Sequence, residues 1–444
     1  MEIKAFYQTN DEHHLFERVS PQPVSSTKNQ QVIQINDGLT YQSIDGFGAS
    51  FTDSSAYLMN QVISQSDQDK MMKKLFDPSV GIGLSVIRNP MGASDYARFI
   101  YSYNELPEGE TDLEQNHFSI AHDETDVLPL TKVAIELNPD VKLFASPWSA
   151  PGWMKTTGSM IGGKLKPDYY ESYAHYFTKF IQAYASHDVP VYAITMQNEA
   201  LFLPPHYPGM EMLAHEQADF AKNYLKPAFV KNNLTTKILA YDHNWDKPEY
   251  AMEVLEDIGE AIDGIAWHWY GGEPDVQSKV KEAYPDKEVH FTEGSGGEWI
   301  PPFEKAFTNT IRRGIQILRN HSKSFILWNM ALDENNGPTI PGFGESTCRG
   351  LLKVNQQTKE VDLTIDYYAL AHFSKFIRPG AVRIDSTNEQ DILTVAFKNK
   401  DGSIAIVIFN DGERDANLTI QLHNQTILSY ASQRKSVATL LIEN

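Results

Sequence analysis

The feature of the sequence that most constrains the fold is a repeated alternation of short apolar runs and amphipathic stretches along residues 43–377. The runs are rich in β-branched and aromatic residues, and in the segments that follow them apolar residues recur every three or four positions. This is the pattern of a strand followed by a helix, and its repetition builds a parallel sheet. The eight runs are 43–51, 83–91, 142–148, 192–199, 237–243, 264–270, 288–294 and 324–330.

Eight strand-helix units predict a closed (β/α)8 barrel, the TIM barrel, for which about 250 residues is typical and a longer chain indicates loop insertions. The alternative is an open doubly wound sheet, which carries a glycine-rich phosphate-binding turn after its first strand. The stretch "GFGASFTDS" at 46–54 lacks the G-x-G-x-x-G spacing of that turn. The barrel is therefore the predicted fold.

Both ends of the chain have the pattern of antiparallel β-structure. Residues 378–444 contain alternating segments such as "ILTVAF" and "IAIVIF", joined by a turn with Asp401 and Gly402, a pair that favours a hairpin. Residues 1–43 hold further strand-like pieces, too few to form a core alone. We expect strands from 1–43 to join a β-sandwich, residues 44–377 to form the catalytic barrel, and residues 378–444 to complete the sandwich.

Composition limits the partners of the chain. With 58 acidic and 38 basic side chains the formal charge is -20, which argues against nucleic acid and anionic membranes because both require basic patches. No run approaches the roughly 18 apolar residues of a membrane span, and the N-terminus lacks the pattern of a signal peptide. We expect a cytoplasmic protein with a small-molecule substrate. A secreted chain trimmed of its leader would have the same sequence.

The candidate site lies at the ends of the eight runs, because TIM-barrel enzymes place their chemistry at the C-terminal ends of the strands. Two of these ends carry glutamates, Glu199 in the fourth run and Glu293 in the seventh. Burying ionised carboxylates is costly, so each is either hydrogen-bonded for structure or held there for chemistry. The other polar and aromatic side chains at these ends include Arg88, Asp95, Trp148, Asn198, Asp242, His243, His268, Tyr270 and Trp328.

The aromatic content of this end of the barrel indicates a sugar substrate. All seven tryptophans fall in or just after the strand-like runs, and aromatic faces suit the C–H faces of sugar rings while polar neighbours bind the hydroxyls. Cleaving a glycosidic bond requires one carboxyl group for the leaving oxygen and a second for the anomeric carbon. The fourth and seventh strands lie on opposite sides of the barrel, so Glu199 and Glu293 can flank one bond.

With these residues the sequence resembles glycoside hydrolase family 30, in the branch that contains glucosylceramidases and bacterial β-glucosidases and β-xylosidases. The resemblance covers nearly the whole chain. The matching stretches are "IDGFGASFTDSSA", "IRNPMGASDY", "LFASPWSAPGWMKTTGSMIGGKLK", "ITMQNEA", "GIAWHWYG", "FTEGSGG", "WNMALDENNGP" and "HFSKFIRPGAVRI".

The resemblance implies a retaining hydrolase that uses no metal and no organic cofactor. Matched by motif, the Glu of "MQNEA" is the acid/base, Glu199, and the Glu of "FTEGS" is the nucleophile, Glu293. The same matching assigns five substrate-binding roles: Asn198 to the sugar 2-hydroxyl, Asp95 and Trp148 to the hydroxyls at the far end of the glycone, Tyr270 to support of the nucleophile, and Trp328 to the pocket floor.

Electrostatics suggest two supporting residues. In a retaining enzyme the carboxyl groups are about 5 to 5.5 Å apart, so the charge on Glu293 is expected to hold Glu199 protonated. Arg88 would keep Glu293 ionised. His268 shares a strand face with Tyr270, and it either orients a carboxylate or is a satisfied core histidine.

Asp95 and Trp148 favour a β-glucosidase as the first interpretation. A β-xylosidase is the alternative, since xylose lacks only the C6 group, and an endo-β-1,6-glucanase or a transglycosylase would use the same residues. A carbohydrate-binding protein on an inactive scaffold would keep the aromatics without needing the carboxylate pair. The loop 333–350 has little in common with the mammalian glucosylceramidase. That loop and the insertion 101–119 are expected to wall the leaving-group side, so a lipid aglycone is not implied.

Overall fold

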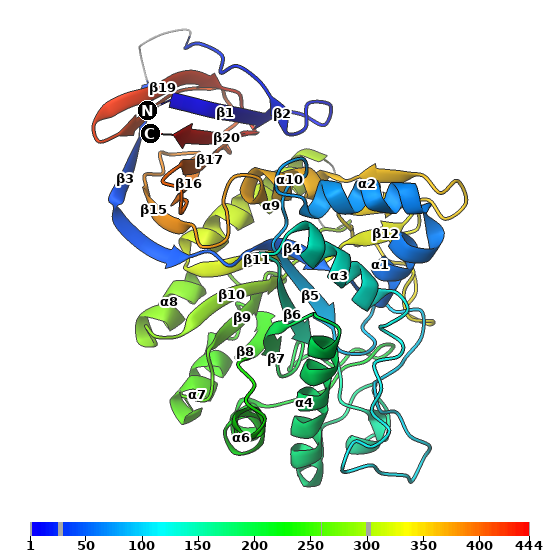
Figure 1. The fold of residues 1–444 in the computed structure, drawn as a ribbon. Helices are drawn as coiled ribbons and strands as arrows, with labels where there is room; N and C mark the ends of the chain where they lie inside the picture. Colours follow the sequence, from blue (N-terminus) through cyan, green and yellow to red (C-terminus); the bar gives the residue numbers. More distant parts are fainter. Residues whose placement is uncertain (1, 25–29, 259, 299–302, 444) are drawn as a thin grey trace.

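The computed structural model describes residues 2–24, 30–258, 260–298 and 303–443, which form a barrel and an adjoining β-domain (Figure 1). Eight parallel strands close the barrel in the order β10-β11-β4-β5-β6-β7-β8-β9, which confirms the predicted fold. The strands are β4 Gly46–Ser50, β5 Val86–Pro90, β6 Lys142–Ser146, β7 Val191–Thr195, β8 Lys237–Asn244, β9 Gly264–His268, β10 Glu288–Glu293 and β11 Ser322–Asn329.

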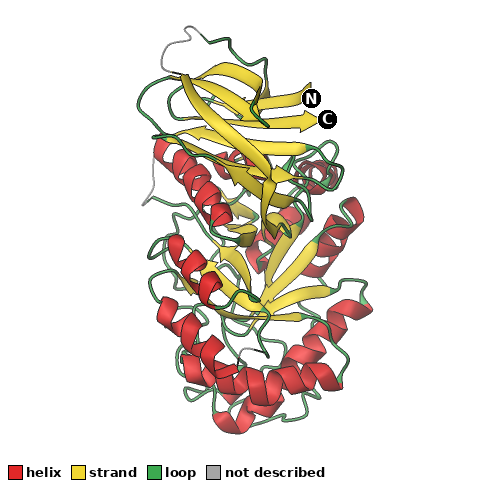
Figure 2. Cartoon of the chain, turned by 90° about the vertical axis from the view of Figure 1, so that its left-hand side faces the viewer, coloured by secondary structure: helices red, strands yellow, loops and turns green. Residues whose placement is uncertain are grey.

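Each barrel strand is followed by helical structure on the outer face of the barrel (Figure 2). α3 illustrates how the sequence ends a helix: it stops at Leu137, and Asn138 cannot easily remain helical because Pro139 follows it. The helices are α1 Asp53–Tyr57, α2 Gln65–Phe76, α3 Val127–Leu137, α4 Tyr170–Ser186, α5 Ala214–Phe220, α6 Lys226–Lys231, α7 Pro248–Ile258, α8 Asp275–Ala283, α9 Phe303–Arg319 and α10 Ile365–Ser374, with short helical turns η1 Leu58–Val62, η2 Gly152–Met154, η3 Pro167–Tyr169 and η4 Ala221–Leu225.

Inward-facing side chains fill the barrel in layers. An apolar layer comes from six strands, and its members are Val86, Phe144, Ala193, Leu239, Ala266 and Ile326. Because side chains alternate along a strand, the next inward position lies two residues further toward the C-terminal end. On four of the strands that position is polar and buried, occupied by Arg88, Ser146, Thr195 and His268. The polar residues of the predicted site thus rest on a packed apolar layer.

The β-domain is assembled from both ends of the chain, as predicted. Its nine strands run in the order β19-β18-β3-β15-β16-β17-β20-β1-β2, and neighbours are antiparallel except for the parallel pair β3 and β18. The predicted hairpin joins β16 to β17, with Gly402 at a φ of 87°. The strands are β1 Glu2–Thr9, β2 Glu17–Arg18, β3 Gln30–Ser43, β15 Val382–Ser386, β16 Ile392–Lys398, β17 Ile404–Asn410, β18 Ala416–Leu422, β19 Gln425–Ser432 and β20 Ser436–Glu443.

The two parts pack through α9 and α10. Arg312 of α9 forms an ion pair with Asp411, which follows β17, at 2.5 Å. The buried His372 of α10 contacts Thr9 and Thr439 of the β-domain through its two ring nitrogens, at 2.7 and 2.8 Å. Burial lowers the pKa of His372 to about 3, so this interface contains a neutral imidazole.

A small sheet of β12 Ala331–Asp333, β13 Leu352–Val354 and β14 Val361–Leu363 follows the barrel's last strand. In the described residues no helix combines the length and apolar character needed to cross a membrane.

Candidate active site

A cavity of about 310 Å³ opens where the barrel strands end. Seven of the nine residues predicted for the site line it, and the other two, Arg88 and His268, lie behind it in contact with lining residues. The lining residues are Asp95, Trp148, Asn198, Glu199, Phe202, Tyr207, His243, Asn244, Tyr270, Glu293, Trp328, Phe343 and Cys348.

The two glutamates reach the cavity in different ways. Glu293 is the last residue of β10, whereas β7 ends at Thr195 and Glu199 lies four residues beyond it, in a turn. Glu199 has a φ of 48°, a left-handed conformation that is uncommon for residues other than glycine and recurs at functional sites. A carboxylate oxygen of Glu199 and one of Glu293 lie within 4.8 Å of each other. The structure therefore brings the predicted pair together.

Glu293 is held at both carboxylate oxygens. The Arg88 guanidinium donates from Nη1 to Oε2 at 2.8 Å, and the Tyr270 hydroxyl donates to Oε1 at 2.9 Å. Arg88 is fully buried and also donates from Nη2 to the Asn198 Oδ1 at 2.8 Å. Because this contact occupies the carbonyl oxygen of Asn198, its amide nitrogen is the atom left to donate to a ligand.

Glu199 is held by His268. The His268 Nδ1 lies 3.4 Å from the Glu199 Oε1, and the Nε2 lies 3.0 Å from the Asp242 Oδ1. Burial alone would lower the pKa of His268, but the charge of Glu293 and the hydrogen bonds with Asp242 and Glu199 raise the pKa to about 9. His268 is therefore an imidazolium at neutral pH with a carboxylate on each side.

In the ligand-free site the pKa shifts of the two glutamates run in the opposite direction to the expectation that the charge of Glu293 holds Glu199 protonated. Burial raises the pKa of both groups, yet the hydrogen bond and charge of His268 lower the pKa of Glu199 below its usual value. For Glu293, burial and the charge of Glu199 outweigh His268 and Arg88, and the pKa is raised. These directions favour negative charge on Glu199 over Glu293 in the ligand-free site, and a glycosyl-enzyme, in which the nucleophile is esterified, likewise needs the other carboxylate as an anion to act as the base.

Two stacked tryptophans and Asp95 form another wall of the cavity. The rings of Trp148 and Trp328 stack with centroids 4.8 Å apart, and the Arg88 guanidinium lies 5.0 and 5.6 Å from their centroids. The Trp328 Nε1 donates to the Asp95 Oδ2 at 3.4 Å, while the Asp95 Oδ1 is a buried atom without a partner in the described residues. Burial and the charge of Glu293 raise the pKa of Asp95 to about 8. Asp95 can thus offer a hydroxyl both a donor and an acceptor.

The position of all seven tryptophans in or just after the strand-like runs did not show which of them reach the cavity. Among the tryptophans that the structure describes, only Trp148 and Trp328 line the cavity. Trp153, Trp245, Trp267 and Trp269 belong to the main hydrophobic core between the barrel and its helices, and Trp299 lies outside the described residues. Barrel strands are buried on both faces, so an outward-facing tryptophan near a strand end packs against a helix just as readily as it lines the mouth.

Sequence reasoning also missed part of the cavity wall. Phe202 and Tyr207 come from the loop after β7, and Phe343 from the loop 333–350, which was predicted to contribute. The insertion 101–119, which was expected on the leaving-group side, contributes no described residue to the lining of this cavity, and its residues 106–111 line a separate groove with Trp153. Loop residues carry no strand periodicity, and only exposed aromatics next to Glu199 could have identified them.

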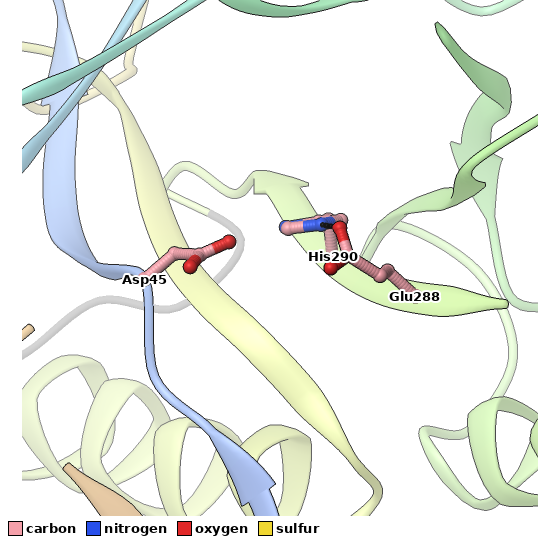
Figure 3. A group of neighbouring side chains, drawn as sticks. All are labelled: Asp45, Glu288 and His290. Carbon is pink, nitrogen blue, oxygen red and sulfur yellow. Dashed lines mark hydrogen bonds and ion pairs between the residues drawn. The ribbon is translucent and has the colours of Figure 1, made fainter. Parts of the chain in front are cut away.

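A second cluster of carboxylates and imidazole closes the opposite end of the barrel. Asp45, which precedes β4, faces Glu288 and His290 of β10 (Figure 3). Three lysines bind the carboxylates: Lys142 contacts Asp45 at 2.5 Å, and Lys237 and Lys323 contact Glu288 at 2.6 and 2.7 Å. Both carboxylates are thus paired with lysine ammonium groups, and the cluster is an ion-pair network.

A closed parallel barrel with two convergent glutamates at its C-terminal end defines the protein as a TIM-barrel enzyme of the glycoside hydrolase class. Comparison with known families is more specific. The model of the glycosyl hydrolase family 30 TIM-barrel domain matches residues 44–377, and that of the family 30 beta sandwich domain matches residues 380–440. The chain therefore belongs to glycosyl hydrolase family 30, as its motifs indicated.

Several relatives match over most of their length. The chain is 31% identical to the endo-1,6-beta-D-glucanase neg1 of Aspergillus fumigatus, with 90% of this chain and 85% of that protein covered. It is 29% identical to the lysosomal acid glucosylceramidase of Mus musculus, with 90% and 81% covered. The solved structure of an endo-beta1,6-glucanase superimposes with a TM-score of 0.88 at 31% identity, covering 98% of each chain.

Proposed function

We propose that the protein hydrolyses β-glucosidic bonds with retention of anomeric configuration, through a covalent glycosyl-enzyme. The observation that supports this best is the separation of the two glutamates, whose nearest carboxylate oxygens lie within 4.8 Å. Carboxyl groups about 5 to 5.5 Å apart suit direct attack by one of them, whereas an inverting enzyme needs about 6.5 to 9.5 Å to admit a water molecule.

The proposed roles follow from the contacts of each carboxylate. Glu293 is the nucleophile, since Arg88 and Tyr270 fix both its oxygens at 2.8 and 2.9 Å. Glu199 is the acid/base: it protonates the leaving oxygen and then, as an anion beside His268, accepts a proton from the attacking water. The Asn198 amide donates to the 2-hydroxyl.

A glucose-type glycone is supported by Asp95, whose free Oδ1 is buried at the tryptophan-lined wall. Nitrophenyl β-glucoside and β-xyloside measured side by side test this choice. We expect a higher kcat/KM for the glucoside, and a xyloside turned over more than about tenfold faster, roughly 1.4 kcal/mol of transition-state preference, would make the protein a β-xylosidase.

Internal cleavage of β-1,6-glucan is the second candidate, because relatives 31% identical over most of the chain are named endo-1,6-beta-glucanases. Product sizes released from β-1,6-glucan separate the two: a mixture of oligosaccharides indicates internal cleavage, and glucose alone indicates removal of terminal residues. Adding an acceptor alcohol to the same reactions shows whether the glycosyl group passes to water or, as in a transglycosylase, to the alcohol.

A further inference from the structure

We propose that Asp242 is a positioning residue that couples the two glutamates of the active site, holding Glu293 through Arg88 and Glu199 through His268. The inference rests on the proposed roles of those glutamates. Asp242 is fully buried, at 0% exposure, and does not line the cavity. It therefore acts on the reaction through its neighbours and does not touch the substrate.

The carboxylate of Asp242 accepts four hydrogen bonds, two at each oxygen. Oδ2 accepts from the Arg88 Nη2 at 2.8 Å and from the Thr195 hydroxyl at 2.6 Å. Oδ1 accepts from the His268 Nε2 at 3.0 Å and from the Thr292 hydroxyl at 2.7 Å. These donors come from β5, β7, β9 and β10, so this one side chain on β8 connects five strands of the barrel. Two of the donors are cations, and such charge-assisted bonds are the stronger ones.

The backbone of β8 is distorted so that Asp242 faces inward. Strict alternation from the inward Leu239 would direct Tyr241 into the barrel. Instead Tyr241 and Asp242 have φ values of 74° and 59°, and the pairing with β9 shifts register there. The Tyr241 ring packs against Trp267 and Asp242 takes the inward place. Bulges of this kind re-aim side chains next to active sites.

The same bulge holds the backbone of Glu199. The Glu199 N–H donates to the Asp242 carbonyl oxygen at 2.9 Å, at the position where Glu199 has its left-handed φ. Asp242 thus fixes Glu199 through a main-chain bond as well as through His268, and it fixes Glu293 through Arg88. Asp242 lies above the apolar layer that fills the barrel. Its bonds to the two sides of the site therefore do not contribute to the packing of that layer.

Asp242 also helps to raise the pKa of His268, through its hydrogen bond and its charge, together with Glu293 and Glu199. The titratable or charged groups facing His268 are Asp242 and His243 on β8, Glu199 after β7, Glu293 on β10 and Tyr270 after β9. Burial alone would raise the pKa of Asp242, but the charge of Arg88 and the hydrogen bonds of His268 and Thr195 hold it far below its ordinary value. Burial lowers the pKa of His268, and the neighbouring anions raise it. Replacing the Asp242 anion with a neutral amide removes one of those anions, so the pKa of His268 falls. The anion of Glu199 then loses its cation and its pKa rises.

The test is the pH dependence of kcat for the Asp242→Asn variant. The substrate is an aryl β-glucoside with a good leaving group, so that breakdown of the glycosyl-enzyme limits turnover. Glu199 must be an anion in that step, so we expect the acidic limb of the profile to move upward by about one pH unit or more. Thr292→Val is the matched control, because it removes one hydrogen bond to the same carboxylate and keeps the charge. It should leave the limb in place, and a purely structural role for Asp242 would lower kcat equally at every pH.

Two further measurements separate this inference from the proposed function. His268→Gln should move the acidic limb in the same direction. The double variant with Asp242→Asn should move the limb no further than His268→Gln does. If Asp242→Asn does not fold, His268→Gln alone carries the kinetic test. Histidine-labelled NMR of the ligand-free protein should show His268 titrating near pH 9 in the wild type and at least about one unit lower in Asp242→Asn. Wild-type protein without activity on any β-glucoside refutes the proposed function and leaves the NMR test standing. An unmoved limb together with an unmoved His268 titration overturns the role of Asp242.

Discussion

Replacing Arg88 by methionine is the sharpest test of how the buried charges are balanced. Arg88 has no exposed surface, and it forms ion pairs at 2.8 Å with both Asp242 and Glu293. Removing one partner of a buried pair costs about 3–5 kcal/mol because the remaining charge is left uncompensated. Since a whole domain is stable by only about 5–15 kcal/mol, Arg88→Met should bring the barrel close to its folding limit.

The cost should depend on pH with a definite sign. In the wild type the pKa of Asp242 is lowered, because Arg88 and its other partners outweigh burial. Its stabilising contribution is therefore fully present above the unfolded pKa and is lost progressively as the pH falls below it. In Arg88→Met the buried carboxylate of Asp242 can avoid being an unpaired charge by binding a proton. For an unfolded pKa near 4, protonating it at pH 7 costs about 4 kcal/mol of folding free energy. That cost shrinks by about 1.4 kcal/mol for each pH unit toward pH 4, so the destabilisation should be greatest at neutral pH.

Urea unfolding followed by tryptophan fluorescence at pH 5, 6 and 7 measures this directly. All seven tryptophans lie within residues 44–377, so the signal reports the barrel and not the β-domain. Arg88→Lys keeps the charge but cannot reach all three partners, and it should lose less than Arg88→Met. The exposed Arg434→Met should change stability by no more than about 0.5 kcal/mol. A loss below about 1 kcal/mol at pH 7, or a loss that does not vary with pH, would refute the proposed charge balance.

Two other changes test the site and the opposite end of the barrel. Glu293→Ala should lower kcat on β-glucosides by at least about four orders of magnitude while sugar affinity persists by calorimetry, since the nucleophile is removed and the cavity remains; substantial remaining turnover would mean that another residue attacks. Glu288→Gln should leave kcat/KM unchanged and destabilise the barrel by about 1–3 kcal/mol at pH 7 in urea unfolding. The reason is that Lys237 and Lys323 lose a carboxylate partner that is 23% exposed. An altered kcat/KM would show that the two ends of the barrel communicate.

The barrel could be predicted because its strands are buried on both faces and stand out as continuous apolar runs. β6 at Lys142–Ser146 and β10 at Glu288–Glu293 start where the sequence runs suggested. Residues directly at strand ends, such as Glu293, were placed well for the same reason. Glu199 was harder: the apolar run continues past Thr195, and nothing in its composition reveals that the chain has already left the strand.

Features that depend on tertiary contacts could not be read from the sequence. Asp242 was visible as an acidic residue at a strand end, but the bulge that turns it inward is seen only in the shifted register between β8 and β9. The raised pKa of His268 depends on the charge of Glu293, later in the chain, and on two carboxylates that lie 26 and 69 positions earlier. Local periodicity identifies which faces are apolar, and it carries no information about which buried charges meet.

Under the proposed mechanism the site contains two fixed cations for one negative charge that moves. Attack on the sugar removes the charge from Glu293, and proton donation creates a charge on Glu199. Arg88 contacts the first carboxylate at 2.8 Å and His268 lies 3.4 Å from the second, so the charge has a cation beside it at both stages. Asp242 bonds to both cations and carries the compensating negative charge. A buried site of low dielectric penalises any unpaired charge heavily, and this arrangement avoids one whether the charge is on Glu293 or on Glu199.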